Sequence, residues 1–288
     1  MHSGPRSMTT LSKSQNSKNM LLVDLSYYIF HRYYVVKSWY VRTQPPTDLD
    51  EKKILQNKVF MSKFDKTFVQ CIYGMARRHR VPRENIVLVQ DEYHDRVWRV
   101  DHYPKYKASR SPKSMDPVMF DHCCYELIPS MNVRLFAYPC AEADDIIACV
   151  VRSPALKNCH KVVITNDNDY LQLLDQAEEA GEDEPSVELY DVRGMDLACR
   201  LKNLTAKEYL MFKILRGDTS DNIPRIIGVK AAERWAKEDL QSCMTFIKEK
   251  SFSEKYEMND LLINFARIPS ELRDGIMDAF LVSCDTCT

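Results

Sequence analysis

Leu21-Leu22-Val23-Asp24 decides how this chain folds, because it joins a β-rich apolar run to an acid at the end of the run. The same arrangement returns in the runs Ile86–Asp91 and Val162–Asp167. Short apolar runs of this kind predict buried strands of a parallel sheet. Ligands of an α/β sheet bind beyond the carboxyl ends of its strands. We therefore expect the acids to meet at one edge of a sheet.

Further acids follow Asp167 at Asp169 and lie in two other short segments, and together the acids form the main candidate site. The set is Asp24, Asp91, Glu142, Asp144, Asp145, Asp167, Asp169, Asp218 and Asp221. So many like charges in one crevice repel one another unless cations lie between them. Ligands that are all oxygen atoms suit Mg²⁺ or Mn²⁺ better than zinc. The sequence therefore predicts a site for hard divalent cations.

The composition allows a large core and leaves the partner open. The chain has 288 residues, 45% of them hydrophobic, and 40 Lys and Arg against 41 Asp and Glu. Clustered acids leave a basic remainder, so the net charge of -1 neither supports nor excludes a polyanionic partner. The ten cysteines form no paired C-x-x-C pattern, which favours reduced thiols over a zinc site.

The first 19 residues are polar and Ser-rich, without an apolar run that would indicate export or membrane anchoring, and predict a disordered tail. Beyond them the pattern predicts helices from about Glu51 to Arg80, from about Met115 to Ser130 and from near Glu142. Residues 178–185 are acidic and predict a surface loop. Past residue 197 the pattern is helical again, with helices expected at 207–215, at 229–240 and from about 270.

One segment combines bases with aromatic residues. It runs from Trp98 to Arg110, directly after the strand that ends at Asp91. Basic side chains can bind phosphates, and aromatic rings can stack on bases. This segment is the best candidate for contact with a nucleic acid, and an exposed basic loop is the plain alternative.

The order of three motifs resembles the 5′ nuclease family, which includes flap endonucleases and the 5′-to-3′ exonuclease domain of bacterial DNA polymerase I. The motifs are Glu-x-Asp-Asp at 142–145, Asn-Asp-x-Asp at 166–169 and Gly-Asp-x-x-Asp-Asn-Ile-Pro at 217–224. The resemblance covers roughly Met20 to Ala236. It implies a twisted, mostly parallel sheet flanked by helices, an arch-like segment near 95–130 and a modified helix-hairpin-helix. The expected division is a tail at 1–19, a nuclease core at 20–196 and a helical region at 197–288.

Within that family the sequence is most similar to the phage replication ribonuclease H. The similarity rests on the run Ile86–Asp91, on Trp98-Arg99 with Lys107 eight residues later, and on the run Leu262–Phe265. It implies a viral protein that acts in the cytoplasm of an infected bacterial host.

The resemblance also implies roles for individual residues. Two Mg²⁺ ions, or Mn²⁺ in their place, are expected. The first would be held by Asp24, Asp91, Glu142 and Asp144. The second would be held, directly or through water, by Asp145, Asp167, Asp169, Asp218 and Asp221. Arg99 and Lys107 are similar to the positively charged catalytic residues that the family has at the foot of the arch. Tyr106 is expected to stack on a base, with Lys105 and Arg110 on flanking phosphates.

Two departures from the family pattern limit what is carried over. Many relatives have Arg seven residues after the first Asp, where this chain has His31 followed by Arg32. The hairpin motif Gly-x-Gly-x-Lys is reduced to Ile227-Gly228-Val229-Lys230, and losing a glycine removes a residue that readily adopts positive φ. The change argues against a potassium site. Duplex binding is still expected from Arg225, Lys230 and Arg234.

The leading hypothesis is a metal-dependent 5′-3′ exonuclease and flap endonuclease with ribonuclease H activity, which removes RNA primers and 5′ flaps in DNA replication. Its expected partners are DNA with flaps or nicks, RNA–DNA hybrids, and a sliding clamp or single-strand-binding protein, with no membrane and a monomeric state. Two alternatives stay open. One is a PIN-type ribonuclease acting on single-stranded RNA, and the other is a flap-binding accessory protein without catalysis.

Overall fold

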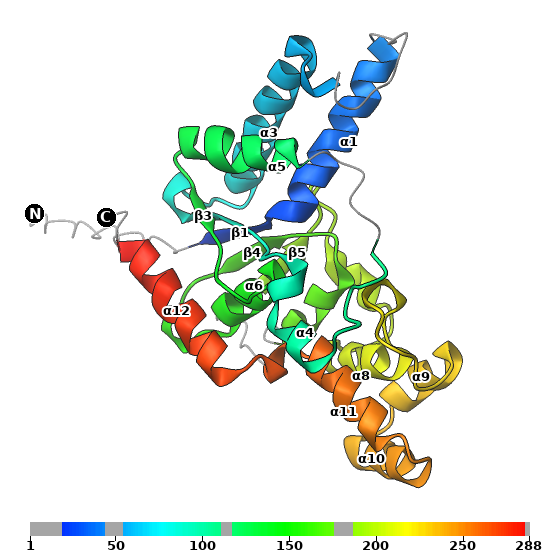
Figure 1. Ribbon diagram of the computed structural model, residues 1–288. Coiled ribbons are helices and arrows are strands. Elements are labelled where there is room, and N and C mark those ends of the chain that lie inside the picture. Colours follow the sequence, from blue (N-terminus) through cyan, green and yellow to red (C-terminus); the bar gives the residue numbers. More distant parts are fainter. Residues whose placement is uncertain (1–18, 44–53, 111–116, 176–186, 286–288) are drawn as a thin grey trace, which may run out of the picture.

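The computed structural model describes residues 19–43, 54–110, 117–175 and 187–285. The predicted tail, apart from Asn19, and the predicted acidic loop at 178–185 lie outside these ranges. Within them, five parallel strands form one sheet in the order β3-β2-β1-β4-β5 (Figure 1). The strands are β1 (Met20–Asp24), β2 (Ile86–Val89), β3 (Arg134–Phe136), β4 (Lys161–Ile164) and β5 (Val187–Tyr190). The predicted α/β class with a parallel sheet is confirmed.

Strand β5 was missed by the sequence analysis. It pairs in parallel with β4, with Lys161 opposite Val187 and Ile164 opposite Tyr190. Its side chains alternate between buried and partly exposed, as expected for the edge of a sheet. Four residues next to an acidic loop give too short a pattern to separate a strand from a loop.

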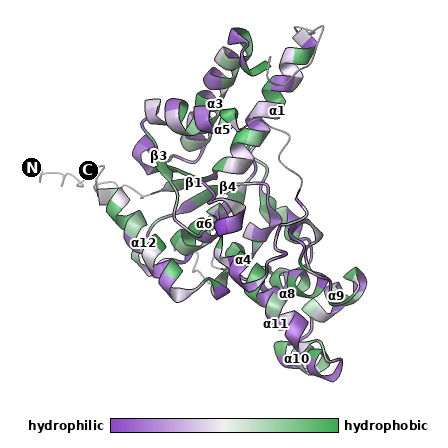
Figure 2. Ribbon diagram, in the orientation of Figure 1, coloured by the Kyte–Doolittle hydropathy of each residue, from purple (hydrophilic) through white to green (hydrophobic). Residues whose placement is uncertain are grey.

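Helices cover both faces of the sheet. Helices α1 (Leu25–Thr43) and α3 (Lys58–Arg78) pack with Leu21 and Val23 of β1 on one face. Helices α6 (Ala143–Arg152) and α12 (Ser270–Asp285) pack with Leu22 on the other. Figure 2 shows α3 and α12 as mixtures of hydrophilic and hydrophobic residues, as expected for helices that face a core on one side only. Alternate residues of β1 therefore belong to two separate cores.

Helix capping explains why several boundaries differ from those expected. Helix α3 begins at Lys58, because the Asn57 side chain accepts hydrogen bonds from the amides of Val59 and Phe60. The helix start predicted near Glu51 lies outside the described residues. The helix expected at 229–240 is divided into α9 (Val229–Ala236) and α10 (Leu240–Glu249), where Asp239 caps α10.

The helix expected from Met115 to Ser130 is irregular. Within the described residues it consists of α5 (Val118–Asp121), a π-helical turn over His122–Leu127 and a 3₁₀ turn over Ile128–Ser130. Pro129 in the last turn has no amide hydrogen to continue an α-helical ladder.

The helices between β5 and α12 form a lobe beside the sheet (Figure 1). It contains α8 (Ala206–Arg216), α9, α10 and α11 (Ser253–Ile263), while the short α4 (Trp98–His102) lies against α11. Leu215, Ala232, Cys243 and Ile247 form its small apolar core. The arrangement of α8 and α9 as a helix-hairpin-helix remains a prediction. No helix in the described ranges is long and apolar enough to cross a membrane.

The first prediction concerns the core between α3 and the sheet. Phe64 is 0% exposed, so Phe64→Ala should lower the free energy of unfolding by about 3–5 kcal/mol through lost burial and a new cavity. Val59 on the same helix is 46% exposed, so Val59→Ala should change it by about 0.5 kcal/mol or less. Urea titrations followed by tryptophan fluorescence would measure both. Equal losses in the two variants would contradict this account of the core.

Candidate metal centre and active site

The acids at the ends of β1 and β2 meet at the carboxyl edge of the sheet. Ser26 donates a hydrogen bond to Asp91 (2.5 Å), and the amide of Tyr27 donates to Asp24 (3.1 Å). The amide of Ala143, in the first turn of α6, also donates to Asp91 (2.9 Å). The start of α6 is thereby joined to the ends of the central strands, as the sequence predicts.

The pKa of Asp24 is raised at this crowded, acidic edge of the sheet. Burial, followed by repulsion from Asp91, raises the pKa of this carboxyl group to about 7, and Asp167 adds to the effect. Hydrogen bonds from Tyr27 and Thr165 oppose the shift without reversing it. A cation at this edge would stabilise the ionised form of Asp24.

Three further acids gather at the N-terminus of α6. Ligand oxygens of Glu142, Asp144 and Asp145 lie within 4.8 Å of one another. Glu142 is the N-cap, and its amide donates to the Asp145 carboxylate (3.1 Å) in a capping box. The positive end of the helix dipole also favours negative charge here.

Arg99 lies inside this cluster and is 1% exposed. Its two terminal nitrogens each donate to Asp145 at 2.8 Å, and one of them also donates to Glu142 at 2.8 Å. The Trp98 indole donates to Asp145 as well (3.0 Å). Asp145 is 0% exposed, so in this structure it anchors Arg99, and a role as metal ligand would require these bonds to change.

Lys107 and Tyr106 reach the same carboxylates. Lys107 pairs with Glu142 and lies 3.8 Å from Asp221, while the Tyr106 hydroxyl donates to Glu142 (2.9 Å). Burial opposes ionisation of Glu142, but Lys107 and Arg99 outweigh it and lower its pKa to about 2. Tyr106 is 3% exposed. In this conformation its ring therefore has no open face for a base, contrary to the stacking expected from the sequence.

A buried lysine that the sequence analysis did not identify pairs with two further acids. Lys213 of α8 contacts Asp169 and donates to Asp218 (2.6 Å). Burial, with repulsion from Asp167, raises the pKa of Asp169 to about 6, against the effect of Lys213. The only sequence signal for Lys213 is its position in an apolar stretch, five residues before Asp218. Lys213 therefore joins the helical lobe to the loop that follows β4.

The basic segment packs against the turn that carries Asp218 and Asp221. Arg110 pairs with Asp221, and the Lys105 carbonyl accepts a hydrogen bond from the Asn222 side chain (2.9 Å). The side chains of Lys105 and Arg110 are exposed. Exposure leaves them accessible to the flanking phosphates expected from the sequence.

Arg200 supports the segment that carries Asp167 and Asp169, in which Asp167 caps a 3₁₀ helix over Asn168–Leu174. The sequence analysis did not identify this arginine. It donates to the Asn166 carbonyl (2.9 Å) and to the side chains of Asn166 (2.6 Å) and Asn168 (2.8 Å). The two asparagines alternate with the two acids, so these hydrogen bonds help to fix the segment from 166 to 169.

The donor set fits a hard cation. One carboxylate oxygen of Asp144 is buried and has no hydrogen-bond partner among the described residues, and Arg99 lies 3.9 Å from it. Buried carboxylate oxygens normally have a partner. A divalent cation held by Asp144 with Glu142, Asp91 and Asp24 would satisfy it with oxygen ligands.

The residues proposed for duplex binding lie in a different part of the chain. Arg225 precedes α9, and Lys230 and Arg234 lie on it, all with exposed side chains. They are accessible, and their contact with DNA remains a prediction.

The comparisons identify the family. The model described as "5'-3' exonuclease, N-terminal resolvase-like domain" matches residues 19–200. DNA polymerase I of Mycobacterium tuberculosis is 32% identical over 152 residues, which cover 49% of this chain and 16% of the polymerase. A 5'-3' exonuclease of Mycoplasmopsis pulmonis is 26% identical over 260 residues, 90% of this chain and 76% of that protein. The chain thus spans only a small part of the polymerases it matches.

Solved structures of bacteriophage T5 proteins share the fold. A T5 5'-exonuclease with bound zinc ions has a TM-score of 0.61 and 17% identity, covering 92% of this chain and 99% of that one. A T5 flap endonuclease in a pseudo-enzyme-product complex with DNA and metal ions has a TM-score of 0.61 and 17% sequence identity. The match covers 93% of this chain and 99% of that one. Because the sequence identity is only 17%, this similarity shows a shared fold and nothing beyond it.

The second prediction follows from Asp24. Its pKa is about 7 in the folded chain against 3.8 in the unfolded one, so between these values the folded state binds more protons. The free energy of unfolding should therefore fall as the pH rises through this window. With EDTA present, Asp24→Asn should stabilise the chain more at pH 8 than at pH 5, by on the order of 2 kcal/mol.

Urea titrations at the two pH values would measure this difference. The exposed Asp278 on α12 provides a control, and Asp278→Asn should have the same small effect at both. A loss of stability in Asp24→Asn that is equal at pH 5 and pH 8 would contradict the prediction.

Proposed function

This chain belongs to the 5′-3′ exonuclease family, and from that membership we propose that it hydrolyses phosphodiester bonds near the 5′ ends of nucleic-acid strands with the help of two divalent cations. The proposed substrates are DNA with 5′ flaps or nicks and RNA–DNA hybrids, as in the removal of RNA primers during replication. A sliding clamp or single-strand-binding protein is a proposed partner.

One observation carries the proposal. The unpartnered carboxylate oxygen of Asp144 lies beside Glu142, at a helix N-terminus that is hydrogen-bonded to the strand-end acid Asp91. Two bound cations, proposed to be Mg²⁺, would lower the pKa of an attacking water and stabilise the leaving oxygen. Asp24, Asp91, Glu142 and Asp144 would hold one, and Asp167, Asp169 and Asp218, with the enclosed Asp145 and Asp221, would surround the other.

Arg99 and Lys107 have different proposed parts. The Arg99 side chain is 2% exposed and binds Asp145 and Glu142, so it positions the acids at the start of α6. The Lys107 side chain is 12% exposed and lies between Glu142 and Asp221. Lys107 is therefore the better candidate for direct contact with the scissile phosphate, where a cation would neutralise developing charge.

One observation favours an accessory protein that binds flaps without cleaving them. Lys107 and Lys213 occupy carboxylates that the nuclease needs for cations, Glu142 in one case and Asp218 in the other. A protein without bound metal could keep these pairs permanently. The nuclease proposal requires that divalent cations compete with them.

The third prediction separates the two functions. Asp144→Asn should reduce cleavage more than about 100-fold, since losing a ligand costs more than the 10–100-fold typical of an outer partner. Time courses on a 5′-labelled flap, a nicked duplex and an RNA–DNA hybrid, with Mg²⁺ or with EDTA, would measure it. Asp278→Asn removes an exposed carboxylate and should cleave like the wild type. Flap binding by the wild type without any product in Mg²⁺ or Mn²⁺ would favour the accessory protein.

A further inference from the structure

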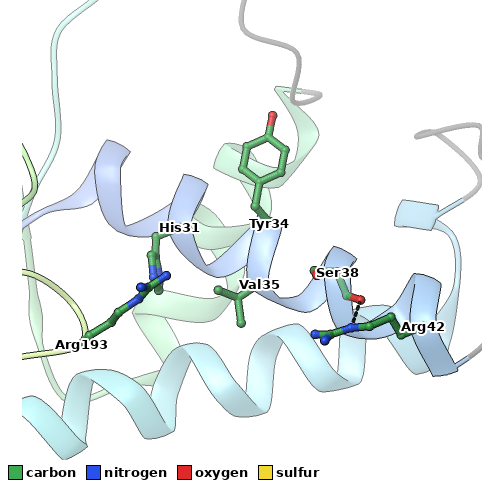
Figure 3. A pocket seen from close by; sticks show the side chains of 6 residues that line it. All are labelled: His31, Tyr34, Val35, Ser38, Arg42 and Arg193. Carbon is green, nitrogen blue, oxygen red and sulfur yellow. Dashed lines mark hydrogen bonds between the residues drawn. The ribbon is translucent and has the colours of Figure 1, made fainter.

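A pocket along α1 does not bring its charged side chains together. Figure 3 shows Arg193 beside His31 at one end and Arg42 at the other, with Val35 between them. Charged groups that are spread along one helix do not converge on a single small ligand. The acid cluster, in contrast, contains a buried polar group without a partner.

This group belongs to Tyr170, to which the family resemblance assigned no role. Tyr170 follows Asp169 in the 3₁₀ helix Asn168–Leu174 and is 1% exposed. Its ring belongs to the core on the α6 face of the sheet, where it lies edge-to-face with the ring of Phe265 at 6.2 Å. Apolar packing therefore fixes the ring, and with it the position of the hydroxyl.

The Tyr170 hydroxyl has no hydrogen-bond partner among the described residues. Buried tyrosine hydroxyls usually have one, because a hydrogen bond to water is lost on burial. Tyr28 has the usual arrangement, since its buried hydroxyl donates to the Phe68 carbonyl (2.6 Å). The hydroxyl of Tyr170 thus requires a partner from outside the described part of the chain.

The charges that act on this hydroxyl are those of the acid cluster. Burial, followed by the charges of Asp24, Asp144 and Asp91, raises the pKa of Tyr170 well above its usual value. The group therefore keeps its proton and can donate it to an acceptor. It forms no hydrogen bond with any of these three carboxylates, which all lie in the described ranges.

Asp144 has the complementary deficiency. Its carboxylate oxygen Oδ1 is buried and lacks a hydrogen-bond partner among the described residues as well. One water molecule can satisfy both groups, because it accepts a hydrogen bond from the hydroxyl and donates one to the carboxylate. A cation alone would satisfy the carboxylate oxygen and leave the hydrogen of Tyr170 unpaired.

We propose that Tyr170 is a positioning residue, whose hydroxyl donates a hydrogen bond to a water molecule enclosed among Asp24, Asp91 and Asp144. Through this water it orients the carboxylates that would hold the first divalent cation. Side chains that are one step removed from a metal ion typically contribute about 10–100-fold to its affinity. The inference rests on the proposed function, because it concerns the same acids.

The fourth prediction tests Tyr170 through cation binding, without any substrate. Mn²⁺ would be titrated into the full chain, and the free ion measured by electron paramagnetic resonance. Tyr170→Phe keeps the ring and removes the hydroxyl, so it should raise the Kd of one Mn²⁺ site on the order of 10-fold. Tyr28→Phe removes a buried hydroxyl that already has a partner on α3, and it should leave the Kd unchanged.

Urea titrations in EDTA separate this role from a purely structural one. The Tyr170 hydroxyl has no partner in the described fold, so Tyr170→Phe should unfold at the wild-type urea midpoint or above it. Tyr28→Phe loses a hydrogen bond and should unfold at a lower midpoint. A midpoint in Tyr170→Phe as low as that of Tyr28→Phe would show that the Tyr170 hydroxyl is bonded within the chain, and would overturn the proposal.

Cation binding also separates this proposal from the proposed catalysis. An unchanged Mn²⁺ Kd in Tyr170→Phe would overturn the role of Tyr170, even if the wild type cleaves flaps. A raised Kd supports the role, even if the wild type cleaves no substrate, in which case only the proposed catalysis fails.

Discussion

The buried ion pair between Arg99 and Asp145 is the interaction on which the rest of the site depends. It joins the base of the predicted arch to the first turn of α6, and Arg99 Nε also donates to the Leu262 carbonyl of α11 (2.9 Å). Removing a guanidinium and a carboxylate from water is costly, so such a pair contributes little net stability. Its effect is geometric, because it fixes three elements around Glu142 and Asp144.

Repulsion between the acids explains why Lys107 and Lys213 lie where they do. Lys107 is placed between Glu142 and Asp221, and Lys213 between Asp169 and Asp218. Each lysine joins an acid near the sheet to an acid on the 218–221 turn. Attraction to two carboxylates offsets the cost of burying each ammonium group, and the lobe is held against the sheet by the charges of the site itself.

The sequence predicted features that depend on neighbouring residues. Strand ends with their acids, the start of α6 at Glu142 and the class of the sheet all follow from local pattern, and the structure confirms them. The cap of α3 at Asn57 is also encoded locally, because Asn is a favoured N-cap residue. The enclosure of Tyr106 and the partners of Lys213 were not predictable from local pattern. Tyr106 contacts Asp221 across 115 residues of sequence, and no periodicity reports such a contact.

Two residues to which the family motif assigns the same role differ in how far they are buried. The resemblance assigned Arg99 and Lys107 the same role, yet the Arg99 side chain is 2% exposed and the Lys107 side chain is 12% exposed. A motif specifies which side chain stands at a position, whereas contact with a substrate requires solvent access. Arg99 is enclosed by the acids it binds, which is why the proposed function gives direct contact with the phosphate to Lys107 and not to Arg99.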